Sequence, residues 1–342
     1  DKVREILRLR FAVEAIPNEK ANTVTISQKE QHQVAYNVAT KSIVLLKNEK
    51  AVLPIRTGKI KKIAVIGLNA TASTASGGMG AGAKTPYEIT PLQGLKNRIC
   101  KDVEIQYAQA YKHFMGMFAG NKANTSEIAQ TLDEAPDAAL LAEAIDVARN
   151  ADLVLFFAGT NKFIESEGID RENIMLPVSQ DMIITRLAEV NPNIVTVVVS
   201  GGPCDLRVVE KKSNAIVQAW WNGLEGGHAL ADVLLGNISP SGKLPFTFPL
   251  KLEDSPAFAL GNFSKEVVSD GDVFAAQFRH DIVGETEYDQ NTDSPAAPYS
   301  EGMLVGYRWF DTKGMPVLYP FGHGLSYADF EYAGIRSDKS KY

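Results

Sequence analysis

The chain has 342 residues, of which 45% are hydrophobic and 22% are charged, and its formal net charge is −6. The acidic balance and the lack of any dense run of Lys or Arg argue against nucleic acid as a partner. No stretch approaches the roughly 18 consecutive apolar residues that a membrane span requires, so no membrane span is predicted.

The first residues predict an arm that leads into a compact domain. Residues 1–25 combine a mixed helical pattern of apolar residues with a polar stretch, which is typical of a connecting segment. Ser27 followed by Glu30 has the spacing of a capping box, and apolar residues then recur at helical intervals up to the run Ile43–Leu46. We therefore expect one large domain over residues 26–342.

Short β-branched runs alternate with helical patterns through the middle of the chain. Strands are predicted over 62–66, 103–107, 153–158, 194–200 and 215–219, and helices over 138–150, 179–190 and 224–235. The apolar continuity of the strands indicates burial on both faces. This alternation predicts an α/β fold, namely a three-layer sandwich with a mostly parallel sheet of about six strands and helices on both faces.

The last part of the chain has weaker patterns. Residues 250–300 are rich in Asp, Ser, Pro and Gly and are predicted to form a long irregular loop, which is usually either functional or disordered. Gly302–Phe310 and Val317–Tyr319 are interpreted as further short extended segments.

One loop stands out as a place for chemistry. Ligands of open parallel sheets bind beyond the carboxyl ends of the strands, so the loops that follow strands are the first candidates. The predicted strand 153–158 is followed by a loop that carries Glu165, Glu167, Asp170 and Arg171. A solvated surface connection has a similar composition, and the residues alone leave both interpretations open.

Glycine, histidine and cysteine residues point to no cofactor or metal. Gly77–Gly82 superficially matches a dinucleotide-binding loop, but such a loop must follow directly on a strand and open a helix, and the predicted strand ends at residue 66. Cys100, Cys204 and the five His residues show no metal-binding spacing, and we expect His323 to have a structural role.

Several segments carry a family resemblance. They are Lys41–Asn48 with Leu53–Ile55, Glu167–Arg171 with Leu176, Pro177 and Gln180, Trp220–Gly227, Gly236–Pro249, and Tyr299–Arg308 with Phe321–Tyr327. In this order they resemble the second, α/β-sandwich domain of glycoside hydrolase family 3, over residues 27–332.

The resemblance implies a retaining mechanism, which uses two carboxyl groups about 5–5.5 Å apart. An Asp nucleophile would come from an upstream (β/α)8 barrel that this chain lacks, and a Glu of this domain would protonate the leaving oxygen. Glu167 is the expected acid/base because it precedes Gly168 in the matching motif, and Glu165 is the alternate.

Other residues are candidates for supporting roles. Asp170 and Arg171 are expected to form an ion pair that orients the loop, with a solvated pair as the alternative. Gly78 lies in what the family suggests is a flexible loop at the rim of the sugar site. Trp220 or Trp221 could line that site, although core packing is the commoner fate of such residues.

The resemblance therefore predicts the second domain of an exo-acting β-glycosidase that needs no cofactor. The expected substrate is a β-linked glucoside first and a xyloside second, and the expected location is periplasmic or secreted. The isolated chain is expected to be inactive because its nucleophile domain is absent, which also keeps a non-catalytic carbohydrate- or partner-binding domain as the alternative. A nucleotide-binding protein is a weaker rival, since Gly67–Ala70 after the first strand is not a Gly-rich turn.

Overall fold

The computed structural model describes residues 1–15, 27–75, 85–112, 135–161, 164–165, 171, 173–177, 179–261, 299–331 and 333–339. They divide into two compact units, residues 1–34 and residues 35–342, and each unit is described by itself. The predicted domain boundary between residues 25 and 26 falls outside the described residues. None of the described helices is long and apolar enough to cross a membrane.

The first unit contains helix α1 (Lys2–Glu14), which buries none of its residues. Val3, Ile6 and Phe11 are all more than half exposed, with exposed fractions of 70%, 66% and 62%. Arg10 Nε donates a hydrogen bond to Glu14 Oε1 over 3.0 Å, one turn further along the helix. The helical pattern predicted for the start of the chain is confirmed.

Helix α2 (Gln28–Ser42) begins with the capping box that the sequence predicts. Ser27 N donates to Glu30 Oε2 over 3.2 Å, and Glu30 N donates to Ser27 Oγ over 3.2 Å. The hydrogen bonds from the Ser27 hydroxyl and from its backbone N–H lower the pKa of Glu30. The backbone N–H groups of Ser27 and Glu30 at the start of the helix are therefore both hydrogen-bonded, each to the side chain of the other residue.

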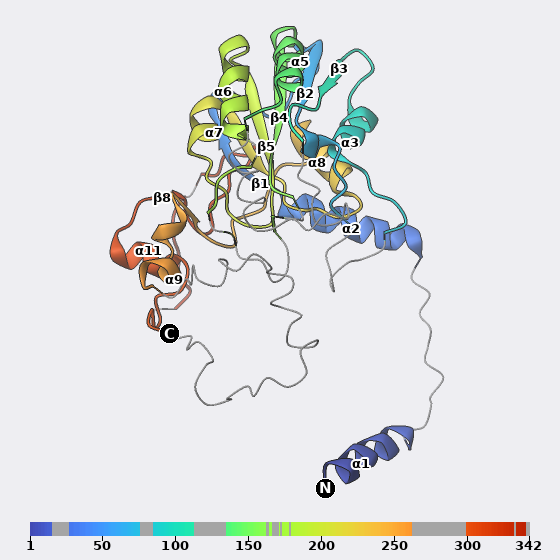
Figure 1. The fold of residues 1–342 in the computed structure, drawn as a ribbon, viewed down its shortest axis with the longest axis vertical. Coiled ribbons are helices and arrows are strands. Elements are labelled where there is room, and N and C mark those ends of the chain that lie inside the picture. The colour runs from blue at the N-terminus through green and yellow to red at the C-terminus, as the bar shows by residue number, and fades with distance from the viewer. Residues whose placement is uncertain are drawn as a thin grey trace. The chain divides into compact units, whose positions relative to one another are not determined.

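A six-stranded sheet forms the centre of the second unit (Figure 1). Its strands are β1 (Val44–Asn48), β2 (Lys62–Ile66), β3 (Glu104–Ala108), β4 (Leu153–Gly159), β5 (Ile194–Val199) and β6 (Ala215–Gln218). The spatial order is β1-β6-β5-β4-β2-β3, and every neighbouring pair is parallel except β1 with β6. The five predicted strands are confirmed, and the apolar run at residues 43–46 supplies a sixth strand that the sequence pattern did not reveal.

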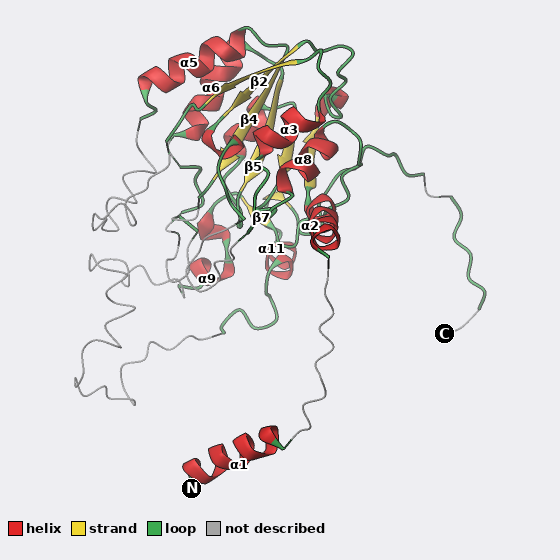
Figure 2. Ribbon diagram, turned by 90° about the vertical axis from the view of Figure 1, so that its right-hand side faces the viewer, coloured by secondary structure: helices red, strands yellow, loops and turns green. Residues whose placement is uncertain are grey.

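Helices cover both faces of this sheet (Figure 2). Helices α5 (Ala138–Arg149), α6 (Gln180–Val190) and α7 (Arg207–Lys212) lie on one face, and α3 (Pro91–Arg98) and α8 (Gly226–Leu234) lie on the other. Side chains of β4 alternate between the two cores: Val154 and Phe156 face α6, and Leu155 and Phe157 face α8. The predicted three-layer sandwich is confirmed.

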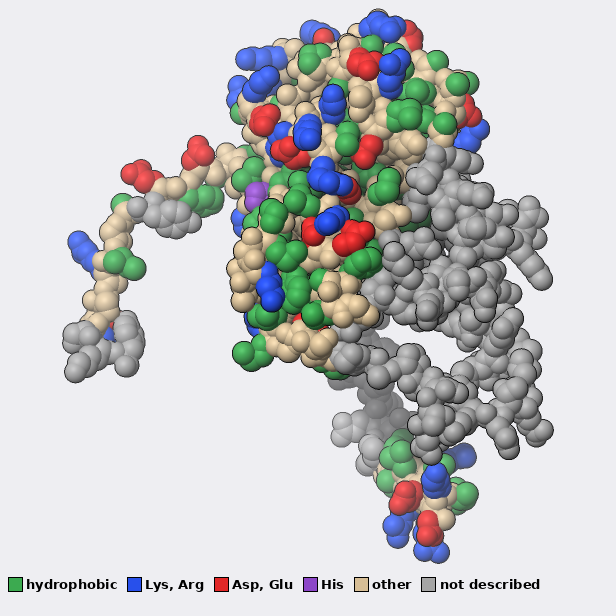
Figure 3. Space-filling view, turned by 60° about the vertical axis from the view of Figure 1, so that its left-hand side comes forward, with side chains coloured by type: hydrophobic (Ala, Val, Ile, Leu, Met, Phe, Trp, Pro, Cys, Tyr) green, Lys and Arg blue, Asp and Glu red, His purple; other side chains and the backbone are tan. Residues whose placement is uncertain are grey.

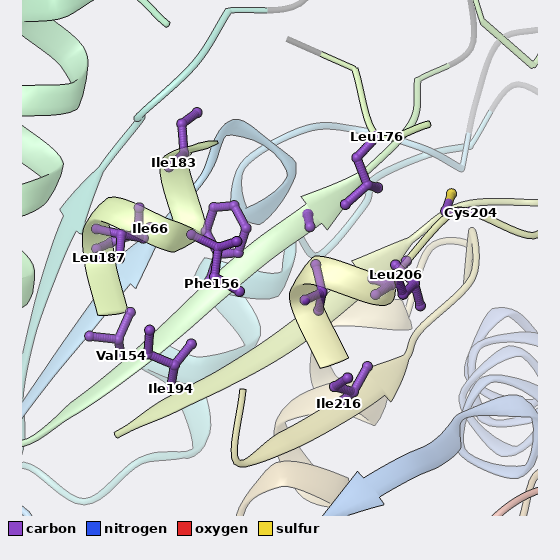
Figure 4. Close-up of a cluster of buried hydrophobic side chains, with 14 of the residues drawn as sticks. Ile66, Val154, Phe156, Leu176, Ile183, Leu187, Ile194, Cys204, Leu206 and Ile216 are labelled. Atoms are coloured by element: carbon purple, nitrogen blue, oxygen red, sulfur yellow. The ribbon is translucent and has the colours of Figure 1, made fainter. Parts of the chain in front are cut away.

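Burial on both faces explains why the central strands read as continuous apolar runs. Every residue of β4 and β5 is buried. Figure 4 shows the core on the α6 side, where Ile66 and Phe156 of two strands lie beside Ile183 and Leu187 of α6, and Ile216 of β6 continues the same cluster toward Leu206. This core fixes the strands whose carboxyl ends carry the candidate site.

The layer of α3 and α8 depends on two glycines that let the helices approach closely. A Cβ atom built on Gly94 would lie 2.0 Å from the backbone oxygen of Gly227, and one built on Gly227 would lie 2.2 Å from the oxygen of Thr90. Helix α3 was not predicted, although Thr90 caps it by accepting from Gln93 N and Pro91 is its first residue.

The C-terminal region adds a two-stranded antiparallel sheet of β7 (Phe248–Pro249) and β8 (Val317–Tyr319), which confirms the extended segment at 317–319. The extended interpretation of Gly302–Phe310 is wrong from residue 307, where α11 (Tyr307–Lys313) begins. Its aromatic residues favour strands, but burial of Trp309 and Phe310, with the Trp309 indole donating to Asp254 O over 3.1 Å, overrides that preference.

The predicted long loop 250–300 is only partly described. The structure shows a short 3-10 turn, η3 (Leu252–Asp254), and a single helical turn, α9 (Pro256–Ala259). Residues 262–298 lie outside the described residues.

Residues 323–325 run along the outer edge of β1. Leu325 N donates to Leu45 O over 2.8 Å, and a ring nitrogen of His323 lies 2.7 Å from Leu46 O. The His323 ring also stacks on Tyr319, with ring centroids 5.0 Å apart. His323 therefore has the structural role that we expected.

Candidate functional site at the carboxyl edge of the sheet

The parallel strands β2, β4, β5 and β6 all end at one edge of the sheet, so the loops that follow them are neighbours. The charged loop after β4 therefore lies next to the loop after β5, which begins at Ser200. Open parallel sheets bind ligands at this position. The arrangement supports a site at the place that the sequence predicts.

The end of β4 is held in a rigid frame. Gly159 has a φ of 135°, and a Cβ atom at this position would lie 1.9 Å from Val199 O, so the close approach of β5 requires glycine. Gln180, fully buried on α6, donates to Gly159 O over 2.9 Å and accepts from Gly159 N over 2.8 Å. The charged loop thus starts from a fixed backbone position.

Glu165 is the carboxylate of this loop that the structure describes. Its Oε1 accepts from Thr160 Oγ1 over 2.5 Å, and its Oε2 accepts from the backbone N–H of Gly201 over 2.7 Å. The side chain is only 12% exposed, and Arg171 Nη1 lies 3.7 Å from Oε1. Both oxygens of Glu165 therefore already serve as acceptors, one within its own loop and one for the loop after β5.

Arg171 contacts both Glu165 and the loop after β5. Its Nη1 donates to Pro203 O over 3.0 Å, and its side chain is 17% exposed. Nη2 is buried and has no hydrogen-bond partner within the described part of the chain. The guanidinium thus contacts the loop after β5 and also the carboxylate of Glu165.

The other predicted site residues fall elsewhere. Glu167, Asp170 and Gly78 lie outside the described residues, so the acid/base assignment and the Asp170–Arg171 pair stay predictions. The structure brings Glu165 and Arg171 together, and sequence reasoning did not foresee this pair. The sequence contains little indication of this pair. Glu165 accepts from a backbone N–H and Arg171 donates to a backbone oxygen, and such backbone partners leave no recognisable sequence pattern.

The two tryptophans after β6 have different surroundings. The Trp220 indole donates to Ser42 O over 2.9 Å, and its ring meets Phe246 edge-on with centroids 5.7 Å apart. Trp221 packs against the core on the α8 side, and its buried Nε1 has no hydrogen-bond partner among the residues that the structure describes. Both rings are at least partly used for packing, and a role for Trp221 in sugar binding stays a prediction.

A small open pocket lies at the same edge, between the β2 loop and α8. Asn69, Glu88, Trp220 and Asn222 are among its lining residues. Asn222 Oδ1 accepts from Ser42 Oγ over 3.0 Å, whereas its Nδ2 is buried without a partner in the described ranges. The pocket offers polar groups next to the loop that carries Glu165.

A series of hydrogen-bonded polar side chains connects α3, α8 and the segment before α3, and the sequence analysis did not predict it. Tyr87 OH donates to Glu225, the ring Nδ1 of His228 lies 2.7 Å from Glu225 Oε2, and Asn97 Nδ2 lies 3.0 Å from His228 Nε2. Burial and the hydrogen bond to Glu225 raise the pKa of Tyr87 to about 12. The spacing of Glu225 and His228 on one predicted helix was the available signal.

Asp181, in the first turn of α6, is an acidic group with an unfavourable environment. Burial and, after it, the Asp205 carboxylate raise the pKa of Asp181 to about 6, while Arg207 acts in the opposite direction. Oδ1 of Asp181 is buried without a partner among the described residues. Arg207 is engaged by Asp205 through contacts of 2.9 Å and 2.6 Å.

Replacing Asp181 with asparagine should therefore stabilise the protein at pH 8. A folded-state pKa above the ordinary value of 3.8 means that the stability falls as the pH rises from about 4 to 6 and stays lower above that range. The whole shift corresponds to roughly 3 kcal/mol, but partial exposure and the favourable position at a helix N-terminus reduce the expected gain to about 1 kcal/mol.

The measurement is thermal unfolding of the Asp181→Asn variant at pH 8 and at pH 4. We expect a gain of roughly 2 °C at pH 8 and little gain at pH 4. Asp146→Asn on α5, an exposed aspartate with a 72% exposed side chain, is the matched control. An equal gain at both pH values would show that ionisation of Asp181 is not the cause.

Comparisons with known proteins agree with this geometry. Residues 43–327 match the family described as the glycosyl hydrolase family 3 C-terminal domain. The chain is 38% identical over 340 residues to beta-glucosidase BoGH3A of Bacteroides ovatus, and the match covers 97% of this chain and 40% of that protein. An exo-alpha-(1->6)-L-arabinopyranosidase of Bifidobacterium longum is 34% identical over 316 residues, which cover 90% of this chain and 35% of that protein.

A solved structure shows the same fold. The GH3 beta-glucosidase of Bifidobacterium adolescentis superimposes with a TM-score of 0.69 and 30% identity, over 96% of this chain and 40% of that one. The chain thus spans about two fifths of the length of these relatives. Both the matched family and the shared fold lead to one conclusion: the chain belongs to glycosyl hydrolase family 3 and is its C-terminal domain.

Proposed function

We propose that this domain supplies the general acid/base carboxyl of a retaining, exo-acting β-glycosidase, and that Glu167 carries that carboxyl. The observation that carries the proposal is the anchored loop after β4, whose Glu165 and Arg171 are tied to the loop after β5 at the carboxyl edge of the sheet. Glu167 stands between these two anchors in the sequence.

The chemistry requires a carboxyl group that keeps its proton until the glycosidic bond breaks. Desolvation against the sugar and the approach of an anionic nucleophile both raise the pKa of such a group. Glu165 is poorly suited to this task, because both its oxygens accept hydrogen bonds and Arg171 lies 3.7 Å away. These contacts support Glu167 as the acid/base and leave Glu165 for another role.

The nucleophile and most of the sugar site are proposed to lie in the remainder of the full-length protein. Retaining glycosidases need a second carboxylate about 5–5.5 Å from the acid. We assign it to an Asp of a (β/α)8 barrel, which the length of the relatives accommodates. The named relatives include beta-glucosidases, so β-glucosides are the first proposed substrates. β-Xylosides stay the second, as the family resemblance of the sequence implies.

The surface of the larger unit fits a neutral, small substrate better than a polyanion. On the face shown in Figure 3, basic and acidic side chains are interspersed over the body of the molecule. The net charge of −6 points in the same direction.

The test compares hydrolysis of p-nitrophenyl β-glucoside and β-xyloside by this chain alone and by the full-length protein. We expect no hydrolysis above background from the chain alone and turnover by the full-length protein, because the chain lacks the proposed nucleophile. Hydrolysis by the chain alone would place a complete catalytic pair within these residues and contradict the proposal. A full-length protein that binds glucosides without cleaving them would favour the non-catalytic alternative.

A further inference from the structure

An Asn–Gly step lies in the turn between β6 and α8. Asn222 is followed directly by Gly223, and no other asparagine of the sequence precedes a glycine. Both residues line the small open pocket at the carboxyl edge of the sheet, which solvent can enter. Asparagine is one of the thermolabile residue types, and a following glycine has no side chain to hinder attack on the amide. The turn therefore combines a labile amide with an unhindered neighbour.

The backbone nitrogen of Gly223 is available as a nucleophile. Its N–H makes no hydrogen bond within the part of the chain that the structure describes. Gly223 has a φ of 69°, and a Cβ atom built on it would meet no atom within 4 Å. Its carbonyl, in contrast, accepts from Gly226 N over 3.0 Å. The peptide group between Asn222 and Gly223 thus has a free nitrogen and open space beside it, although the next peptide group is held in place.

The side-chain amide of Asn222 is held in a way that favours loss of its nitrogen. Its Oδ1 accepts a hydrogen bond from Ser42 Oγ over 3.0 Å, and such a donor stabilises the negative charge that develops on this oxygen when Cγ is attacked. Its Nδ2 has no hydrogen-bond partner among the described residues, so no contact has to break when this atom leaves. The amide of Asn237 differs, because its Nδ2 donates to Asp232 Oδ1 over 2.8 Å.

We propose that Asn222 is a site of spontaneous deamidation through a succinimide, which places a new carboxylate in the pocket. The Gly223 nitrogen attacks Cγ of Asn222, the bond from Cγ to Nδ2 breaks, and the proton of the Gly223 N–H leaves with Nδ2 as ammonia. Water then adds across one of the two C–N bonds of the imide. Opening at Cγ gives aspartate, and opening at the main-chain carbonyl carbon gives isoaspartate. This inference goes beyond the proposed function and does not depend on it.

The product changes both the charge and the main chain at the pocket. A carboxylate at this position would stand in the same pocket as Glu88, and one of its oxygens would replace the buried Nδ2 of Asn222, which has no partner in the described ranges. Isoaspartate also lengthens the main chain by one carbon atom, directly before the turn that leads into α8. Both changes disfavour the folded state, so the deamidated protein should unfold at a lower temperature.

The test follows the folded chain during incubation at mildly alkaline pH, where the peptide nitrogen loses its proton more often. Peptide mapping by mass spectrometry measures the deamidated fraction at each asparagine, and labelling with isoaspartyl methyltransferase measures isoaspartate. Asn191 and Asn237 are internal references, because the Nδ2 atoms of both donate hydrogen bonds over 2.8 Å. We expect aspartate and isoaspartate to accumulate at Asn222, several-fold faster than deamidation at either reference.

Variants identify the reacting residues. Asn222→Gln keeps an amide but lengthens the side chain, so ring closure slows and most of the acidic species on isoelectric focusing should be lost. Gly223→Ala adds a methyl group beside the attacking nitrogen and should slow deamidation at Asn222 several-fold. Because alanine is strained at the positive φ of this position, Asn222→Gln supplies a result that does not depend on that strain. Asn237→Gln is the matched control and should leave the acidic species unchanged.

The same chain unfolded in urea gives the intrinsic rate of deamidation at Asn222, and we expect the rate in the folded chain to be of the same order. Three results would overturn the inference. A folded chain that deamidates at Asn222 no faster than at Asn191 and Asn237 would show that the fold protects the turn. Aspartate without isoaspartate would indicate direct hydrolysis of the amide instead of a succinimide. Acidic species that persist in Asn222→Gln would place the reaction at another residue.

Discussion

In the full-length enzyme, Glu167→Ala is expected to lower kcat/KM for phenyl β-glucoside by about 100- to 10,000-fold, which is the range that general acid catalysis contributes. Departure of 2,4-dinitrophenolate needs little protonation, so kcat/KM for that glucoside should fall by less than about 10-fold. Added azide should restore turnover of the activated substrate by attacking the glycosyl-enzyme without base assistance. Steady-state kinetics with and without azide provide the measurement.

The same experiment identifies the acid between the two candidates. An equal loss on both substrates would give Glu167 a structural role instead of a chemical one. Because Glu165 already accepts from Thr160 and Gly201, we expect Glu165→Ala to impair the poor leaving group less severely than Glu167→Ala. A larger, azide-rescued effect at Glu165 would move the assignment to that residue.

The largest expected effect on stability comes from the contact between α3 and α8. In Gly94→Ala, the new Cβ would lie 2.0 Å from Gly227 O and 2.1 Å from its carbonyl carbon. Backbone atoms cannot rotate away as a side chain does, so the two helices must separate and lose part of the core that they cover. We expect the free energy of unfolding to fall by about 3 kcal/mol or more.

Thermal unfolding measures this loss, which corresponds to a decrease of roughly 6 °C or more in Tm. Gly58→Ala is the matched control, because a Cβ at this exposed glycine meets no atom within 4 Å. A similar, small change in both variants would mean that α3 and α8 adapt without cost, and the close glycine contact would then be unimportant.

The sequence predicts those parts of the fold in which one pattern dominates. The four central strands β2, β4, β5 and β6 are buried on both faces and appear as apolar runs, so they were predicted, and the less buried edge strand β3 was predicted with them. Strand β1 follows a helical pattern without a break, and its pairing with β6 depends on residues far along the chain. Helix α3 has eight residues and few apolar ones, so only Thr90 and Pro91 marked its start.

The location of the candidate site could be predicted from the sequence, whereas its contacts could not. The position of the charged loop follows from the rule that ligands bind at the carboxyl edge of a parallel sheet. The contacts that tie Glu165 and Arg171 to the loop after β5 could not be predicted, because they are made with the backbone atoms of Gly201 and Pro203. Backbone donors and acceptors occur at almost every residue, so a sequence does not show which of them a side chain will meet.

The segment that runs along β1 also bears on self-association. A strand edge with free N–H and C=O groups can template pairing with another chain, and natural sheets cover or charge such edges to prevent aggregation. At β1, backbone and side-chain partners from residues 323 and 325 occupy two of these carbonyl groups. At the opposite edge, β3 begins with the exposed, charged Glu104. Within the described part of the chain, one edge of the sheet is thus covered and the other is marked by charge, a combination that disfavours fibril-like stacking of partly folded copies.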